Sequence, residues 1–221
     1  MNNYTTAEIN DFSQKENGYL ALFCLRLGNL CVKADAQAMM PVTVTLENSE
    51  YNFEDVAEAT KPNDYTFDTT PKNENSTLAI VQGVLESHPE FKVKVMYKEY
   101  SDGSKVKHII FTMPDVDKDR RDLLTETAKT FYKECLAKLE LSYNKRLADT
   151  AQLFLHIPED ADTAKKTFEK TYKDAKENAE KLLNTNLDEI EEGYQRYLMG
   201  EDNEWENDYK EDTSVDLSEL S

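Results

Sequence analysis

The stretch IIFTMPDVDKDRRDLL, residues 109–124, contains the change of pattern that decides the fold. Up to Met113 the stretch is apolar, as expected for a buried strand. After Pro114 charged residues lead into Leu123 and Leu124, which open a long run of apolar residues at helical spacing. The sequence therefore predicts that a segment containing a sheet ends here and a long helix begins.

Two long helices are predicted downstream of this stretch. From Asp119 to about His156 apolar residues recur every three or four positions, and Ile157-Pro158-Glu159-Asp160 interrupts the pattern. The same spacing resumes from about Asp162 to Met199. Two helices of this length joined by a short loop should pack antiparallel. The predicted seam of the second comprises Phe168, Tyr172, Ala175, Ala179, Leu182, Asn186, Ile190, Tyr194 and Tyr197.

Upstream of the stretch, a first helix is predicted from Thr6 to about Lys33, because its apolar residues share one face. From Pro41 the period changes to two, which indicates half-buried strands. We expect strands at 42–46 and 65–69, a short helix at 76–87, and a hairpin of strands at 92–100 and 105–111 around a turn that contains Gly103.

These elements predict an α+β protein in which a small α/β domain is inserted into an antiparallel three-helix bundle. A long acidic stretch that is poor in aliphatic residues ends the chain, and such composition is typical of disorder. The expected organisation is a discontinuous bundle at 1–38 and 114–200, an inserted domain at 39–113 and an acidic disordered tail at 201–221.

The chain is strongly acidic, with a formal net charge of −18 and a pI near 4.6. Residues 181–221 contain 13 acidic and three basic residues, so the acidity is concentrated towards this end. Nucleic-acid binding draws most of its affinity from Lys and Arg that neutralise phosphates. This composition argues against RNA binding in general, although it leaves room for a local basic face.

The sequence predicts a soluble, cytoplasmic protein without a membrane segment. Residues 1–16 lack a basic start and an apolar core, so no secretory signal is expected. The apolar run 19–32 is shorter than the roughly 20 residues needed to cross a bilayer. Cys24, Cys31 and Cys135 lie in apolar helical patterns, and we expect them to be reduced core residues.

No catalytic or cofactor motif is present. His88, His108 and His156 have no Cys or carboxylate at ligand spacing, so we expect no metal site. Gly-rich phosphate-binding loops and the nucleophile motif GxSxG are absent. The sequence thus predicts a protein that is not an enzyme and needs no cofactor.

The predicted hairpin places several lysines on one face, because alternate residues on paired strands point the same way. Lys94, Lys105 and Lys107 are candidates for binding phosphate or an acidic protein partner. The alternative is that these lysines protect an edge strand from aggregation.

The order of the predicted elements resembles ribosome recycling factor. Residues 109–124 are similar to that family's passage from its last strand into its second bundle helix. The resemblance covers about Thr6 to Met199. The other matching segments are Val42-Thr43-Val44, Tyr51-Asn52-Phe53, Ser76 to Leu85, Ala128-Lys129 and Ile157-Pro158-Glu159-Asp160.

Membership of this family would imply a monomer that enters the ribosome after termination and separates the subunits together with elongation factor G. It would act by its shape and by contacts to large-subunit RNA, without chemistry of its own. The candidate RNA-binding residues are Lys33, Arg120, Arg121, Lys129, Lys145 and Arg146.

Two basic motifs of the family are altered here. Where the family has Arg-Thr-Gly-Arg-Ala, residues 30–34 are LCVKA, so Lys33 keeps one basic position. A second cluster aligns with Lys145-Arg146 only after a shift of one or two residues. The gapless alignment places Glu140, Tyr143 and Asn144 at its arginines. An alternative function therefore stays open, an acidic adaptor or inhibitor that kept the bundle and binds proteins.

Overall fold

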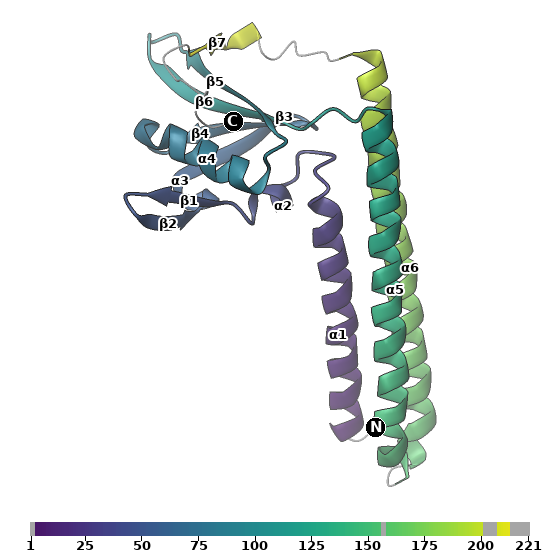
Figure 1. The fold of residues 1–221 in the computed structure, drawn as a ribbon. Coiled ribbons are helices and arrows are strands. Elements are labelled where there is room, and N and C mark those ends of the chain that lie inside the picture. Colours follow the sequence, from purple (N-terminus) through teal and green to yellow (C-terminus); the bar gives the residue numbers. More distant parts are fainter. Residues whose placement is uncertain (1–2, 156–157, 201–206, 213–221) are drawn as a thin grey trace. The chain divides into compact units, whose positions relative to one another are not determined.

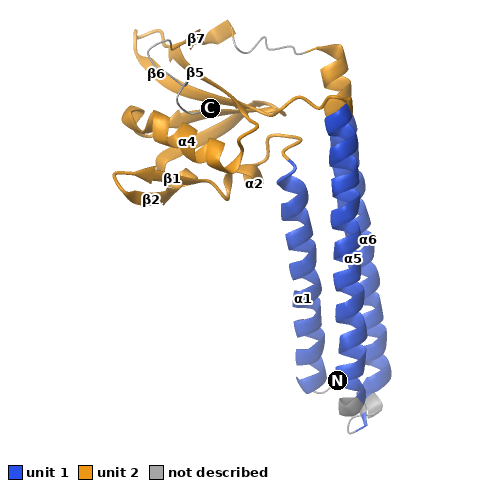
Figure 2. Cartoon of the chain, in the orientation of Figure 1, with its two compact units in different colours: residues 1–30, 119–191 blue, residues 31–118, 192–221 orange. Residues whose placement is uncertain are grey.

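The computed structural model describes residues 3–155, 158–200 and 207–212, and the chain forms two compact units. One comprises residues 1–30 and 119–191 and is called the helical unit here. The other comprises residues 31–118 and 192–221 and is called the mixed unit (Figure 2). The bundle boundaries expected at 38, 114 and 200 differ from these limits by several residues, because the end of the third helix packs with the mixed unit.

Three long helices supply the helical unit: α1 Asn3–Gly28, α5 Lys118–Phe154 and α6 Pro158–Met199 (Figure 1). Arg26, near the end of α1, forms an ion pair of 2.5 Å with Glu134 of α5. Glu8, near the start of α1, contacts Arg146, further along α5. The two helices are therefore antiparallel, and the predicted α+β fold with an antiparallel bundle is confirmed.

Aromatic side chains from all three helices form the core of the bundle around Phe12. Phe12 of α1 meets the ring of Phe168 of α6 edge to face at 5.3 Å. Tyr143 of α5 stacks on Tyr172 of α6 at 4.7 Å. Phe12 and Phe168 are fully buried, so each helix contributes large apolar surface to one shared core.

The predicted seam of α6 has the right spacing of buried residues from Phe168 to Ile190, but not every predicted position is buried. Leu183 is buried rather than Leu182, and Tyr197 is 46% exposed. From residue 192 onward α6 belongs to the mixed unit, where a Cβ on Gly193 would lie 2.9 Å from a methyl group of Val116. The bundle seam therefore ends before the helix does.

The mixed unit contains two antiparallel sheets among its described residues. One pairs β1 with β2, and the other has the strand order β3-β4-β6-β5-β7. The elements are α2 Ala36–Met39, β1 Thr43–Leu46, β2 Ser49–Asn52, α3 Phe53–Val56, β3 Ala57–Asn63, β4 Thr66–Pro71, η1 Glu74–Ser76, α4 Thr77–Ser87, β5 Lys92–Glu99, β6 Lys105–Thr112 and β7 Lys210–Glu211.

Helix α4 packs tightly against the backbone of β1. A Cβ on Gly83 would lie 2.4 Å from the carbonyl oxygen of Thr43, a separation that only glycine permits. Ile80, Val81 and Val84 on the same helix are fully buried in the main core. This close approach fixes the position of α4 and of the chain that follows it.

Each predicted strand and the short helix are present, but the sequence analysis missed β2, β3, β7, α2 and α3. The first helix ends at Gly28 instead of Lys33, and Cys31 then takes a left-handed backbone conformation with φ 52°. Pro62 belongs to β3. A proline is tolerated there because β3 is an edge strand.

Part of the predicted disordered tail forms a strand. Residues 210 and 211 pair with β5, which corrects the expectation for this segment, while 201–206 and 213–221 lie outside the described residues. No described helix combines the length and apolar composition that crossing a bilayer requires.

Candidate functional site

The candidate RNA-binding arginine of the bundle core, Arg146, is held by acids of a neighbouring helix. Its guanidinium contacts both Glu8 and Asp11 of α1. The Arg146 side chain is only 13% exposed. Two carboxylates thus neutralise this arginine within the chain, and a phosphate would have to displace them.

Most of the other candidates on the helical unit have intramolecular partners as well, and Lys145 is exposed. Arg120 donates a hydrogen bond of 3.4 Å to the carbonyl oxygen of Leu30. The remaining two pair with acids on α5, Arg121 with Asp122 at 2.9 Å and Lys129 with Glu126 at 3.5 Å. Lys33 lies in the mixed unit, where it pairs with Glu192 at 2.6 Å.

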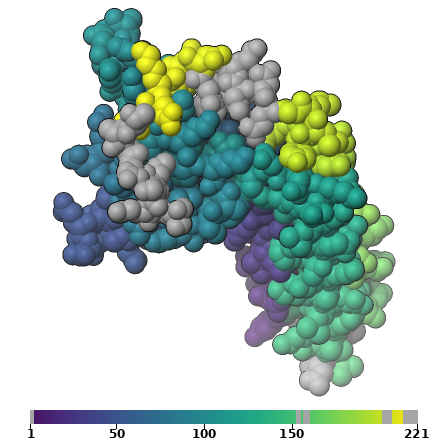
Figure 3. All heavy atoms as spheres, turned by 45° about the horizontal axis from the view of Figure 1, so that its top comes forward, coloured from purple at the N-terminus to yellow at the C-terminus, as the bar shows by residue number. Residues whose placement is uncertain are grey.

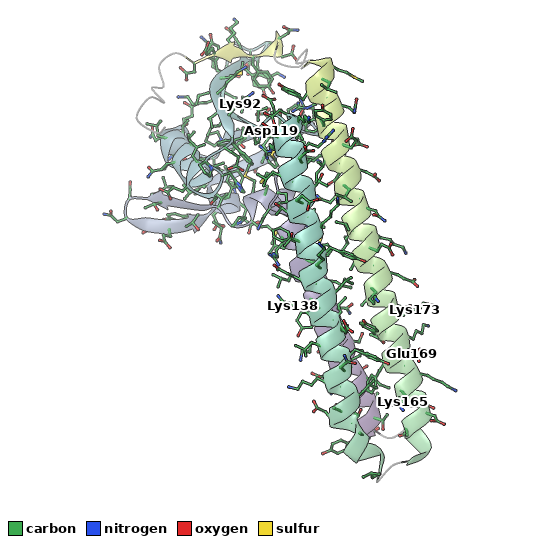
Figure 4. All side chains as sticks on the ribbon, turned by 45° about the vertical axis from the view of Figure 1, so that its right-hand side comes forward. Lys92, Asp119, Lys138, Lys165, Glu169 and Lys173 are labelled. Carbon is green, nitrogen blue, oxygen red and sulfur yellow. The ribbon has the colours of Figure 1, made fainter. Side chains whose placement is uncertain are left out.

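The outer faces of α5 and α6 carry charges of both signs. Figure 4 shows Lys138 on α5 and Lys165, Glu169 and Lys173 on α6, all exposed. Glu169 has a lysine four residues to either side, a spacing that stabilises a helix in water. These labelled positions form a mixed surface rather than a continuous basic stripe.

The chain's own acidic segment pairs with the edge of the lysine-rich hairpin. We call residues 207–212 the tail segment. It adds to the edge of β5, with Tyr97 opposite Lys210 and the Asp212 amide donating to the Val95 carbonyl oxygen at 3.0 Å. In Figure 3 this segment, in yellow, lies against the hairpin.

Ion pairs accompany this strand pairing. Lys107 meets Asp212 at 3.2 Å, and Lys98 meets Asp208 at 3.7 Å. Of the other two candidates, Lys105 lies 4.8 Å above the Tyr97 ring and Lys94 is exposed. The register places Lys105 and Lys107 opposite Glu99 and Tyr97 but Lys94 opposite Ile110, so Lys94 lies on the other face of the hairpin. The expectation of one common lysine face is therefore wrong.

A buried polar cluster anchors the tail segment to the sheet. The Tyr209 hydroxyl donates a hydrogen bond of 2.7 Å to Asp68, whose other oxygen lies 2.7 Å from Nδ1 of His108. Burial, followed by the hydrogen bond to Asp68, raises the pKa of Tyr209. Sequence analysis missed this cluster because no local spacing relates positions 68, 108 and 209.

A second cluster joins the chain after α1 to the end of α4. The sulfur of Cys31 lies 3.4 Å from Nδ1 of His88, and a Glu90 oxygen lies 4.0 Å from the same nitrogen. Cys31 and His88 are buried, and Glu90 is exposed. The sequence showed no ligand group at ligand spacing from the histidines, but packing brings Cys31 to His88 from 57 positions away and Asp68 to His108 from 40 positions away.

An open pocket of about 560 Å³ in the mixed unit offers a mostly apolar wall. Its lining includes Met39, Phe53 and Phe67, with Lys61 as a cationic group. Such a pocket suits an apolar group, and its lining contains no His or Cys to act as a nucleophile or a base.

Comparison with known proteins shows the fold. No family model and no curated protein matches the sequence. Among solved structures, the chain is similar to the solution structure of the ribosome recycling factor, with a TM-score of 0.67 and 13% identity. The match covers 87% of this chain and 100% of that chain. The architecture predicted from residues 109–124 is thus the fold of ribosome recycling factor.

Proposed function

We propose that this protein acts in translation, binding the ribosome and separating its subunits after termination without chemistry of its own. The observation that supports this most directly is the fold match, which includes the whole length of ribosome recycling factor. That likeness concerns the fold, and one fold can serve several functions, so the experiment below tests ribosome binding directly.

A stiff helical body suits a protein that works by shape. At 1.5 Å per residue, the 42 residues of α6 extend over about 63 Å, and the 37 of α5 over about 55 Å. The aromatic contacts among Phe12, Phe168, Tyr143 and Tyr172 tie these helices to α1. Such a bundle resists bending and transmits force between bound partners, which in this proposal are ribosomal RNA and elongation factor G.

Lys145 is the first basic side chain to test for RNA contact, because it is exposed, whereas Arg146 is partly buried against two carboxylates. Co-sedimentation with ribosomes over a salt series measures its role. We expect Lys145→Glu to weaken binding and to reduce the salt slope by about one unit. The matched control is Lys173→Glu, at an exposed position of α6. An absence of co-sedimentation at low salt contradicts the proposal.

A second candidate function is an acidic adaptor or inhibitor that binds a protein partner. The specific observation in its favour is that Glu8 and Asp11 neutralise Arg146 within the bundle, in a chain whose net charge is −18. Phosphate binding is disfavoured on such a surface. A cross-linking pull-down that recovers one protein in stoichiometric amount, without ribosomal RNA, would favour this function over the first.

A further inference from the structure

The thiol of Cys31 is placed by an unusual backbone conformation. Its φ of 52° lies in the left-handed region, which a non-glycine residue adopts when its surroundings impose it. The residue is 1% exposed, and its sulfur lies 3.4 Å from Nδ1 of His88. The turn after α1 therefore directs a buried thiol at an imidazole nitrogen.

His88 is oriented on two further sides. Its Nε2 lies 2.5 Å from the carbonyl oxygen of Ala38, and a carbonyl oxygen only accepts, so Nε2 carries the hydrogen. Phe91 stacks on the imidazole at 4.6 Å with an interplanar angle of 8°. This tautomer of the neutral ring has its lone pair on Nδ1, the arrangement in which a histidine binds a metal while a backbone carbonyl holds its other nitrogen.

Glu90 supplies a carboxylate on the solvent side of this pair. Its Oε1 lies 4.0 Å from Nδ1 of His88, and its side chain is 41% exposed. The ligand atoms of Cys31, His88 and Glu90 all lie within 4.8 Å of one another. We propose that these three residues bind one Zn²⁺ ion.

The spacing fits zinc. Tetrahedral coordination with bonds of about 2.3 Å to sulfur and about 2.05 Å to nitrogen separates the two ligand atoms by about 3.5 Å. The observed distance between Cys31 and His88 is 3.4 Å. The corresponding distance to a carboxylate oxygen is about 3.4 Å from the nitrogen and about 3.6 Å from the sulfur. Because the three ligand atoms are spread over as much as 4.8 Å, the exposed Glu90 has to move by about an ångström. A water molecule would complete the four ligands.

The ligand types select the metal. A thiolate and an imidazole are the ligands that zinc prefers, whereas magnesium and calcium prefer oxygen. Zn²⁺ displaces the proton of the Cys31 thiol, which leaves to solvent. The thiolate and the Glu90 carboxylate then balance the two positive charges of the ion.

Zinc at this site would join the chain after α1 to the end of α4, both within the mixed unit. The alternative without metal is a hydrogen bond from the Cys31 thiol to Nδ1 of His88. The two differ in a measurable way, because only metal binding creates a metal–thiolate bond and releases a proton. The proposal does not depend on ribosome binding.

Titration of the reduced, metal-free full chain with Co²⁺, followed by Zn²⁺ competition, tests the site. We expect one equivalent of Co²⁺ to give a thiolate-to-metal charge-transfer absorption that Zn²⁺ abolishes. Cys31→Ser should remove this absorption, and Glu90→Gln should weaken Zn²⁺ binding at least about tenfold. The matched controls, Cys24→Ser and Glu86→Gln, should bind as the unsubstituted chain does.

Two results overturn the proposal. One is a full chain that shows no charge-transfer absorption with Co²⁺. The other is undiminished Zn²⁺ binding in both Cys31→Ser and Glu90→Gln, which would assign the ion to adventitious surface groups. If Cys31→Ser fails to fold, exposed Glu90→Gln decides alone, and an affinity equal to that of Glu86→Gln overturns the proposal.

Discussion

The helical unit and the mixed unit differ in which kinds of side chain they bury. In the helical unit a regular seam is filled by apolar groups such as Phe12 and Phe168, and its charged groups lie mostly outside. In the mixed unit Cys31, His88, Asp68 and His108 are all buried. Long helices repeat one packing solution, whereas strands and short helices bring distant residues together. Clusters of reactive groups are therefore found in the mixed unit.

Truncation of the bundle core should have the largest effect. Phe168→Ala removes a fully buried ring that touches Phe12, and we expect a loss of about 3–5 kcal/mol in the unfolding free energy. Hydrogen exchange should show reduced protection of α1, α5 and α6 while β4 and β6 keep theirs. The exposed neighbour Lys165→Ala is the control. An equal loss of hydrogen-exchange protection in both units would show that the two units unfold together.

The mixed unit should be most sensitive where two backbones touch. Gly83→Ala places a methyl group against the Thr43 carbonyl oxygen, so we expect a loss of about 1–3 kcal/mol in denaturant unfolding. Gly18→Ala on α1 meets no atom within 4 Å and should stabilise by roughly 0.5–1 kcal/mol, because alanine suits a helix better. If both substitutions changed the unfolding free energy in the same direction, the close approach of α4 to β1 would not be what requires glycine at position 83.

Besides its strand pairing and ion pairs, the tail segment donates one side-chain hydrogen bond to a buried acid. Tyr209→Phe removes the hydroxyl that donates to Asp68, and we expect local destabilisation of about 1.5 kcal/mol. Faster hydrogen exchange at the amide of Asp212, which bonds to Val95, measures it. Tyr100→Phe, at a 46% exposed ring, is the control and should change little. Unchanged exchange at Asp212 would show that the strand pairing holds the segment alone.

Glu16 breaks the apolar character of the bundle and should give the smallest effect. It is 1% exposed, and burial raises the pKa of its carboxyl, while the Ser142 hydroxyl and then the charge of Lys15 partly oppose the shift. A group whose pKa is raised on folding adds stability below its unfolded pKa, here about 4.5, and that contribution disappears as pH rises through the folded pKa.

Replacing this carboxyl with a neutral amide should therefore stabilise the protein at neutral pH. We expect Glu16→Gln to raise the unfolding free energy by about 1 kcal/mol at pH 7, and the gain should shrink towards pH 4. Thermal melts across that pH range measure the difference. Glu140→Gln, at an exposed position of α5, is the control. A gain that is the same at both pH values would contradict a protonation effect.

The sequence was informative where structure depends on near neighbours. The period of apolar residues located α1, α5, α6, the short helix α4 and the hairpin, and the break at Pro114 placed the return to the bundle. β2 and β3 were missed because their residues are mostly exposed and show no alternation of burial. Tyr197 was misassigned because the period continues along α6 after the helix leaves the bundle.

The sequence by itself determined the α+β architecture, since helical and strand periods follow from local geometry and the burial of one face. The tertiary structure alone decided that Arg146 is neutralised by Glu8 and Asp11, that the tail segment lies on the hairpin, and that Cys31 meets His88. These contacts join residues tens to more than a hundred positions apart. Their distances are set by how elements pack, and no pattern along the chain encodes them.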